Sequence, residues 1–471
     1  MEIKNDDISL IIQKVLQEMG KRDLMVEESD GIFDNMDEAI HAADIAQKEL
    51  VAMSLEEREK LICAMRKAIL DNASKIAEIC VEDTGMGRKD HKYLKLKLVA
   101  NKTPGTEVLK TMAITGDKGL TLIEMGPFGV IGGITPSTNP SATVMCNSIG
   151  MIASGNSVVF SPHPGAIQSC LISVRVLNKA IVEAGGPSNL ITTLRKPSLE
   201  STDEMINNPK IRLIVATGGP FIVKKVLSSG KKAIGAGAGN PPVVVDETAD
   251  IAKAARDIIA GCCFDNNLPC IAEKEAIVVE TVYEKLIAEM LKNGNVYELN
   301  EEQREKIVDV VMVKSEENGK VRYRVNKNFV GKDAAVILAA AGIDPPKGVE
   351  CLICRAENCH PFVQEELMMP ILPIVKVKNV DEAIKTAVLD EHGNRHTAMM
   401  HSKNVDNLTK MARRIDTTIF VKNAPSYAGI GFGGEGWTTF TIAGPTGEGI
   451  TNASTFTRQR RCTMVDSFRI I

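Results

Sequence analysis

The sequence predicts an α/β protein with more than one domain, and three observations support this prediction. The chain has 471 residues, well beyond the size at which a single hydrophobic core keeps growing. From Gly129 to Val245, short β-prone runs alternate with helical segments, which is the order expected of a largely parallel sheet. A second alternating stretch follows along the chain.

Composition narrows the class of protein further. Apolar residues make up 44% and charged residues 25% of the chain, as in an ordinary soluble globular protein. A net charge of −4 gives no reason to expect nucleic acid as a partner. No apolar run is long enough to cross a membrane, and the start, MEIKNDDISL, lacks the layout of a secretory signal. The 11 cysteines are therefore expected to be reduced thiols in a cytosol-like compartment.

Residues 1–19 are expected to form an amphipathic helix. Asp7 is a suitable N-cap, Gly20 a suitable stop, and residues 20–35 are typical of a polar linker. Because a helix of about three turns is marginal alone in water, it should either pack on its own protein or dock in a partner's groove. Its apolar stripe, at helical spacing, consists of Ile8, Ile11, Ile12, Val15, Leu16 and Met19.

The next segments are a charged helical region, a hairpin and the two alternating stretches. Helical spacing extends over residues 37–97, and residues 111–125 contain two β-prone runs around Gly116, which is typical of a hairpin. The tail from Pro445 is polar, as expected of a segment that exchanges with a neighbouring subunit. The strand candidates of the two alternating stretches are VIGGI, NSVVFSP, LITTL, IRLIVATGG and NPPVVVD, then EAIVVE, AAVIL, ECLICRA and ILPIVKVK.

Two local patterns could bind ligands, and each also has an ordinary structural explanation. TGGP, residues 217–220, precedes a helical segment and could hold a phosphate at the helix N-terminus, but a tight turn explains it nearly as well. CLICRAENCH, residues 351–360, has the residue types of a zinc site. Cys351 and Cys354 lie in an alternating run, however, which sends them to opposite faces of a strand, so we expect no metal site.

Cys270 ends the loop-like segment NNLPC. A cysteine on a loop with backbone amides behind it can have a lowered pKa and act as a nucleophile. Taken alone, the residue is equally well explained as a packed thiol.

Seven segments taken together are more specific. They resemble the aldehyde dehydrogenase superfamily and, within it, the CoA-acylating branch, above all the propionaldehyde and acetaldehyde dehydrogenases of bacterial microcompartments. The resemblance covers nearly the whole chain from about Met36, and residues 1–19 are similar to the encapsulation peptides of that group. The segments, in chain order, are GPFGVIGGITPSTNP, NSVVFSPHPGA, VATGG, NNLPC, QEELMMPILP, HTAMMHS and GPTGEGITNASTFTRQRRC.

The resemblance implies an aldehyde dehydrogenase fold with three parts. Residues 36–235 would form a Rossmann-like cofactor-binding domain, interrupted by the hairpin at 111–125. Residues 236–425 would form an α/β catalytic domain. Residues 426–471 would be a return segment and tail that complete, with the hairpin, a small β oligomerisation arm.

The resemblance also assigns the reaction centre. Cys270 matches the nucleophile, which as a thiolate would attack the aldehyde carbon. Its backbone N–H and the Asn139 side chain would hold the oxyanion, although the family asparagine stands one place earlier, where this chain has Thr138. Such donors are worth about 3–4 kcal/mol each. Glu366 matches the carboxylate that bonds the nicotinamide ribose, and its alternative is a surface helix carboxylate.

An absent base points to the acyl acceptor. Hydrolytic relatives carry a glutamate as general base for water, at the place where this chain has Gly235, 35 residues before Cys270. A general base supplies a factor of about 10²–10⁴, so without it the thioester is left for a thiol, and the resemblance supplies coenzyme A. His396 matches a histidine that could accept the CoA proton, with an ordinary pKa near 6.5; its alternative is a structural histidine capping a strand.

The cofactor is expected to be NAD. Ser161 stands where many relatives have a lysine on the adenosine ribose, so we infer no preference for the extra phosphate of NADP. Cys262 and Cys263 are expected to be core residues of the helix before the catalytic loop. The residues expected to line the cofactor pocket, besides Glu366 and Ser161, are Thr135, Pro136, Pro162, His163, Thr217, Gly218 and Gly219.

The sequence therefore predicts a CoA-acylating aldehyde dehydrogenase that converts acetaldehyde or propionaldehyde, NAD and CoA into acyl-CoA and NADH. We expect a homo-oligomer, a dimer or tetramer, in the cytoplasm within a bacterial microcompartment, docked on shell or cargo proteins through residues 1–19. The alternatives are a hydrolytic aldehyde dehydrogenase and an inactive homologue kept as an interaction protein.

Overall fold

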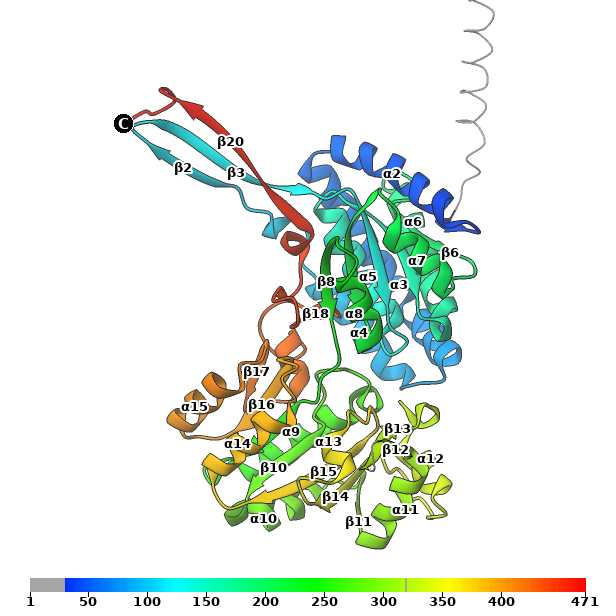
Figure 1. The fold of residues 1–471 in the computed structure, drawn as a ribbon, viewed down its shortest axis with the longest axis vertical. Helices are drawn as coiled ribbons and strands as arrows, with labels where there is room; N and C mark the ends of the chain where they lie inside the picture. Colours follow the sequence, from blue (N-terminus) through cyan, green and yellow to red (C-terminus); the bar gives the residue numbers. More distant parts are fainter. Residues whose placement is uncertain (1–29, 318–319) are drawn as a thin grey trace, which may run out of the picture.

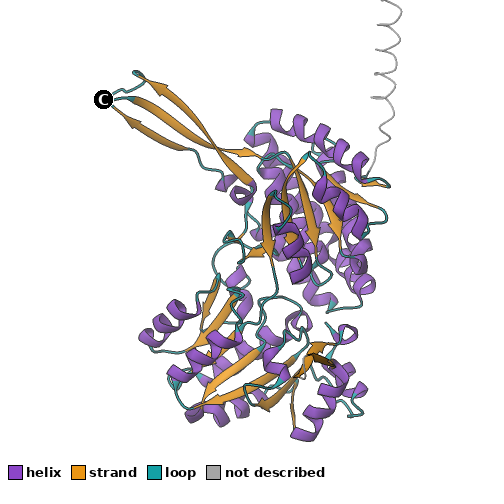
Figure 2. Ribbon diagram, viewed as in Figure 1, coloured by secondary structure: helices purple, strands orange, loops and turns teal. Residues whose placement is uncertain are grey.

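The computed structural model describes residues 30–317 and 320–471 as two α/β domains and a projecting arm (Figure 1). The helix expected at residues 1–19, and most of the expected linker, lie outside the described residues. Figure 2 shows helices around the sheets of both domains, whereas the arm has no covering helix.

The first domain contains a six-stranded sheet in which every neighbouring pair is parallel. Its order is β1-β6-β5-β4-β7-β8. From β4 the chain continues outward to β5 and β6 on one side, and then crosses to β7 and β8 on the other side, so the strand order reverses at β4. In such sheets, ligands bind beyond the carboxyl ends of the strands around this reversal. The strands are β1 (Ile32–Phe33), β4 (Val130–Thr135), β5 (Ser157–Pro162), β6 (Ile191–Leu194), β7 (Ile211–Thr217) and β8 (Lys232–Ala236).

Helices cover both faces of this sheet. One apolar cluster joins the sheet to α2, α7 and α8, and another joins it to α3, α4, α5 and α6. Local sequence sets the helix ends: Ser54 and Glu57 form a capping box before α3, and Gly85 ends it at φ 65°. These helices are α2 (Met36–Ala52), α3 (Leu55–Thr84), α4 (Lys89–Lys102), α5 (Pro140–Ala153), α6 (Ile167–Glu183), α7 (Leu199–Asn207) and α8 (Pro220–Leu227).

One described segment, Pro164–Glu183, is long and apolar enough to cross a membrane, with a mean hydropathy of 1.2. No such run was expected from the sequence. More than half of the segment is buried, and α6 packs against α3 and α5 inside the first domain. Its apolar character is therefore that of a core helix.

The second domain contains a seven-stranded parallel sheet in the order β11-β14-β15-β10-β9-β16-β17. Cys351 and Cys354 of β14 lie in two different apolar clusters, so they face opposite sides of the sheet. The strands are β9 (Pro242–Val245), β10 (Glu275–Val279), β11 (Val296–Leu299), β14 (Cys351–Ala356), β15 (Ile371–Val377), β16 (Thr397–His401) and β17 (Ile419–Lys422).

The prediction of a strand for AAVIL, residues 334–338, is wrong. These residues lie in helix α12, which begins after Asp333. A short apolar run has no periodicity that separates a buried strand from a buried helix, and here the neighbouring alanines favour the helix. The helices of this domain are α9 (Ile251–Cys263), α10 (Glu280–Leu291), α11 (Glu301–Val311), α12 (Ala334–Ala340), α13 (Pro361–Gln364), α14 (Val380–Asp390) and α15 (Val405–Ile415).

The arm is a three-stranded antiparallel sheet that projects from the first domain (Figure 1). The strands β2 (Met112–Gly116) and β3 (Gly119–Pro127) form the expected hairpin, and β20 (Thr457–Val465) from the tail pairs along the whole of β3. The remaining strands form two short antiparallel pairs, β12 (Met312–Glu317) with β13 (Lys320–Val325) and β18 (Ile442–Ala443) with β19 (Gly449–Ile450).

The chain passes from the first domain to the second after β8 and returns after β17 (Figure 1). The crossing segment that follows β8 runs directly into β9. It therefore lies where the two sheets meet, and this is where the expected site residues gather.

Candidate active site

Four residues far apart in sequence come to one edge of the second sheet. Gly239 precedes β9, Cys270 precedes β10, Glu366 precedes β15 and His396 precedes β16. These strands are neighbours in the order β15-β10-β9-β16, and all are parallel. Their amino ends therefore share one edge, and the topology brings the expected nucleophile, carboxylate and histidine together.

The expected cofactor residues share the carboxyl edge of the first sheet. Thr135 ends β4 and is paired with Pro162 at the end of β5, while Thr217 ends the neighbouring strand β7. Pro136 follows Thr135 directly. His163, after β5, is exposed, and its Nδ1 accepts the Gly165 N–H at 3.0 Å.

Two further features bear on cofactor binding. The Ser161 side chain is buried, and its hydroxyl lies 2.7 Å from the Thr202 hydroxyl, so it faces the protein interior. Gly218 and Gly219 lead into α8, whose first turn has no side-chain cap, and a Cβ at Gly219 would meet nothing within 4 Å. Uncapped amides with free space before them suit a pyrophosphate, so the residues present fit NAD.

The catalytic loop begins with Asp265, Asn266 and Asn267, three consecutive residues at φ 50–65°. Asparagine and aspartate tolerate this left-handed region best among non-glycine residues. Their side chains also hold the turn: Asn266 Nδ2 donates to the Gly331 carbonyl at 2.9 Å, and Asn267 Nδ2 donates to the Glu273 carbonyl at 2.9 Å. The loop that presents Cys270 is therefore rigidly built.

Lys274 is a buried ammonium beneath this loop. Its Nζ donates to the Asn267 carbonyl at 2.9 Å and to Asn267 Oδ1 at 2.6 Å. Burial lowers the pKa of Lys274, while the charges of Glu366 and Cys270 oppose this shift. Lys274 was not predicted as a site residue from sequence, because a lysine between two glutamates is typical of an exposed charged segment.

Cys270 is half-buried, and its thiol is protonated at neutral pH. Burial, with a smaller effect from Glu366, raises the pKa of Cys270 to about 12, against the opposing charges of Lys274 and Lys95. The expectation of a lowered pKa from the loop position is therefore wrong for this state, because desolvation of the thiolate outweighs the nearby cations. A nucleophilic role for Cys270 would therefore require the thiol to lose its proton as it reacts.

Glu366 lies in the loop after α13, not on a surface helix. Burial raises the pKa of its carboxyl, and Lys274 and a hydrogen bond from the Gly239 N–H oppose that shift. The charges of Glu366 and Cys270 both act on the pKa of Lys274, and the charges of Lys274 and Glu366 both act on the pKa of Cys270. The three groups are therefore electrostatically coupled.

His396 is buried beside the same segment. A Cβ at Gly239 would lie 2.9 Å from His396 Cγ and 3.0 Å from the Cys270 carbonyl oxygen, so the histidine ring and the nucleophile's backbone flank this glycine. His396 Nδ1 lies 2.9 Å from the Thr397 hydroxyl, and Nε2 is buried without a hydrogen-bond partner. Burial and the Lys274 charge lower the pKa of His396 to about 4, well below the ordinary value assumed from sequence. The ring is therefore neutral.

Asn139 precedes α5 and contacts a buried charged cluster. Its Oδ1 accepts a hydrogen bond from Lys95, which also pairs with Asp265, and Lys92 Nζ donates to Asp265 at 3.2 Å. Lys92 and Lys95 were missed in the sequence analysis, since lysines three apart on a charged helix are ordinarily exposed. Thr138 faces the cluster only through its carbonyl, 3.5 Å from Lys92 Nζ, and its hydroxyl, 3.5 Å from Asn139 Nδ2.

Gly235 is buried inside β8. A Cβ there would lie 2.9 Å from Val223 Cγ1, so a larger side chain would require the strand or α8 to move. No glutamate side chain can therefore be supplied from this position. Cys262 and Cys263 are buried near the end of α9, in the core behind the loop.

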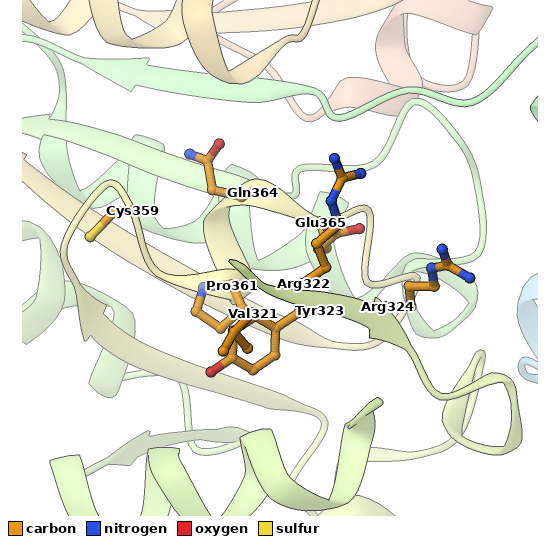
Figure 3. A pocket seen from close by; sticks show the side chains of 8 residues that line it. All are labelled: Val321, Arg322, Tyr323, Arg324, Cys359, Pro361, Gln364 and Glu365. Atoms are coloured by element: carbon orange, nitrogen blue, oxygen red, sulfur yellow. The ribbon is translucent and has the colours of Figure 1, made fainter. Parts of the chain in front are cut away.

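A hollow in the described part of the chain lies away from these residues. It has a volume of about 440 Å³ and is formed by the hairpin β12–β13 and the segment around α13. Figure 3 shows that its polar side chains point in different directions, and none of the expected catalytic side chains lines it. The lining residues are Val321, Arg322, Tyr323, Arg324, Cys359, Pro361, Gln364 and Glu365.

Comparison with known proteins places this geometry in a family. The aldehyde dehydrogenase family matches residues 21–454. An acetaldehyde dehydrogenase (acetylating) of Bilophila wadsworthia is 47% identical over 490 residues, covering 100% of both chains.

Two solved structures are also similar. The propionaldehyde dehydrogenase of the Clostridium phytofermentans fucose-utilisation microcompartment has 55% identity and a TM-score of 0.90, over 94% of this chain and 100% of that one. The Rhodopseudomonas palustris propionaldehyde dehydrogenase, solved with bound CoA and an acylated cysteine, has 53% identity and a TM-score of 0.89, over 93% and 99%.

Proposed function

Because this chain belongs to the aldehyde dehydrogenase family, we propose that it is a CoA-acylating aldehyde dehydrogenase that oxidises acetaldehyde or propionaldehyde to the acyl-CoA. One observation carries the proposal. Cys270, Glu366 and His396 share one sheet edge, while the place of the hydrolytic base is a buried glycine, Gly235. Relatives named as an acetylating acetaldehyde dehydrogenase and as propionaldehyde dehydrogenases, one of them with CoA and an acylated cysteine, support it.

The first step forms a bond between Cys270 Sγ and the aldehyde carbon. The carbonyl electron pair moves to oxygen, and the thiol proton leaves as the bond forms. Glu366, which the resemblance assigns to the nicotinamide ribose, is also the carboxylate whose charge acts on Cys270, and its raised pKa suits it in addition to accept this proton. The oxyanion of the thiohemiacetal is held by the Cys270 backbone N–H and by Asn139 Nδ2.

The second step oxidises this adduct. NAD, when bound, accepts the hydride of the former aldehyde carbon, and an acyl thioester remains on Cys270 Sγ. The groups of the chain that would contact the cofactor in this proposal are those at the carboxyl edge of the first sheet, with the first turn of α8 holding the pyrophosphate, and Glu366 at the nicotinamide ribose.

The third step transfers the acyl group to CoA. The CoA sulfur attacks the thioester carbon, the bond to Cys270 Sγ breaks, and acyl-CoA leaves. His396 is neutral, so it can take up the CoA proton and return it to the departing Cys270 sulfur. Water competes poorly because no carboxylate side chain is supplied at position 235.

The test is a single turnover with aldehyde and NAD. Without CoA, one equivalent of NADH and an acyl adduct on the peptide containing Cys270 are expected by mass spectrometry, with turnover resuming once CoA is added. Cys270→Ala should give neither. Full-rate formation of free carboxylate without CoA would instead establish the hydrolytic alternative.

We propose further that the protein works as a homo-oligomer in the cytoplasm, within a bacterial microcompartment, and docks on shell or cargo proteins through residues 1–19. The microcompartment relative and the apolar stripe of residues 1–19 support this. Deleting residues 1–19 should leave turnover unchanged and stop co-purification with shells, whereas equal packaging of the truncated chain would reject the docking role.

A further inference from the structure

The Asn139 side chain makes an unusual contact for its position. Asn139 stands before α5, where an asparagine ordinarily accepts an N–H of the helix's first turn. Its side chain makes no such bond. Its Oδ1 accepts instead from the ammonium of Lys95, a buried residue of α4.

This contact fixes the orientation of the amide. An ammonium has only donors, so the atom of Asn139 that faces Lys95 must be the carbonyl oxygen. Nδ2 therefore points away from Lys95. Its contact with the Thr138 hydroxyl is long, at 3.5 Å, so the Nδ2 hydrogens are not committed to a strong bond.

Lys95 is itself held by the loop that carries the nucleophile. It pairs with Asp265, which is fully buried and lies five residues before Cys270. Asp265 Oδ1 also accepts the Arg88 N–H at 2.7 Å. The bonds from Asp265 to Lys95 and from Lys95 to Asn139 thus tie an amide of the first domain to the Cys270 loop of the second.

Lys92 separates the effect of charge from the effect of contact. Lys92 and Lys95 lie on the same helix, are both buried, and both bond to Asp265 Oδ2. Only Lys95 bonds to the Asn139 side chain. Because the Lys95 charge also acts on Cys270, the comparison of the two lysines is made together with a variant of Asn139.

We propose that Lys95 is a positioning residue that holds the Asn139 amide with its Nδ2 hydrogens facing the thiohemiacetal oxygen formed on Cys270. This inference rests on the proposed function. It assigns no contact between Lys95 and the substrate. The Lys95 charge also lowers the pKa of Cys270 directly, and the positioning effect is the part of its influence that passes through Asn139.

A double-mutant cycle tests that dependence. The rate of the CoA-free NADH burst is measured for the wild type, Lys95→Met, Asn139→Ala and the double variant, with Lys92→Met as the matched control. Lys95→Met should slow the burst about 10²-fold, as loss of an oxyanion donor does, and the double variant should be much less impaired than the product of the two single effects. The burst rate of Lys92→Met should stay close to that of the wild type, since Asp265 still pairs with Lys95 in this variant.

The proposal would be overturned if the effects of Lys95→Met and Asn139→Ala were additive, as a general folding defect would make them. It would also be overturned if Lys92→Met and Lys95→Met slowed the burst equally. The two failures are distinguishable. A wild-type protein that forms no acyl adduct on Cys270 refutes the proposed function, whereas a normal adduct with an additive cycle refutes only the role of Lys95.

A second readout needs no turnover. A trifluoromethyl ketone adds Cys270 Sγ to its carbonyl carbon, and ionisation of the resulting hemithioketal hydroxyl is followed by fluorine NMR. Lys95→Met should raise the pKa of this hydroxyl by about one unit or more, a tenfold loss of oxyanion stabilisation, and Lys92→Met should raise it less. An unchanged value in Lys95→Met would contradict the proposal.

Discussion

Lys274 sets the electrostatics of the reaction centre at the level of single residues. Its charge favours the ionised form of Cys270 and of Glu366, and it opposes protonation of His396. Sequence segments identified the three residues on which Lys274 acts. They did not identify Lys274, because its burial depends on a turn that closes over it from Asn267 to Pro269.

Replacing His396 should separate the two half-reactions. We expect His396→Gln to leave the CoA-free NADH burst nearly intact and to slow acyl transfer to CoA about 10²-fold, the usual contribution of a proton-transfer group. Rapid-quench measurement of acyl-CoA formation from the preformed thioester checks this. His401→Gln is the matched control, because His401 is equally buried on β16, with a pKa also lowered to about 4.

The same pKa predicts a pH profile. At equilibrium, His396 becomes protonated only as the pH falls towards 4. Between pH 7 and 6, the rate of acyl transfer should therefore change with pH in the same way in the wild type and in His396→Gln. A loss of activity centred near pH 6.5 and absent in that variant would mean that the ring is solvated and would contradict the assigned environment.

Glu273, next to Lys274, should make stability depend on pH. Burial raises the pKa of Glu273 to about 7 from an ordinary 4.5. Between these values the folded protein holds a proton that the unfolded chain has released, so stability falls as the pH rises through 7. Relative to Glu273→Gln, the wild type should lose on the order of 3 kcal/mol between pH 5 and pH 8.

Urea unfolding of both proteins at the two pH values measures this difference. The comparison cancels the opposing contributions of His396 and His401, whose lowered pKa values make stability fall with acid instead. A difference between wild type and Glu273→Gln that does not change with pH would show that Glu273 ionises normally.

At the level of elements, the crossing segment between β8 and β9 determines how closely Cys270 and His396 approach. Gly239→Ala would place a methyl group 2.9 Å from His396 Cγ and 3.0 Å from the Cys270 carbonyl oxygen. Both must shift, and we expect at least a tenfold loss of kcat with the fold retained, since small displacements of reacting groups are costly. Burst kinetics and thermal unfolding measure the two effects.

Gly237→Ala is the control on the same segment. Its Cβ would meet only Pro445 Cγ, at 3.7 Å, which is an ordinary contact. If both alanine variants lose activity equally, the loss comes from reduced flexibility of the segment and not from the close approach at Gly239.

Sequence patterns predicted elements well where periodicity was long and poorly where it was short. The parallel strands with β-branched runs and the hairpin at 111–125 formed as expected, whereas AAVIL became α12. The left-handed conformation of the three residues that begin the Cys270 loop could not be predicted either. Asp-Asn-Asn marks a turn, but the left-handed geometry depends on distant partners such as the Gly331 carbonyl.

For the whole molecule, the family resemblance predicted the fold class and the function, and the comparisons confirm both. The bonds that join the domains could not be predicted in the same way. Lys95 and Asp265 are 170 positions apart and meet only because the carboxyl edge of one sheet lies against the amino edge of the other. No local sequence pattern in α4 predicts that arrangement.

The arm should control assembly. Its strands expose apolar side chains to an extent unusual for an isolated surface, among them Ile114 at 52%, Met112 at 57% and Val465 at 62%. If the arm packs against another copy of the chain, Ile114→Glu places a charge in that interface and should shift the protein from oligomer to monomer at micromolar concentration. Sedimentation velocity measures the mass.

Val336→Glu is the matched control for this prediction. Val336 is 47% exposed on α12 of the second domain, away from the arm, so the same change there should leave the oligomer intact. Because the residues of the proposed active site come from both domains of one chain, the Ile114→Glu monomer should still give the NADH burst. An oligomer that survives Ile114→Glu, or is lost equally in Val336→Glu, would show that the arm does not hold the subunits together.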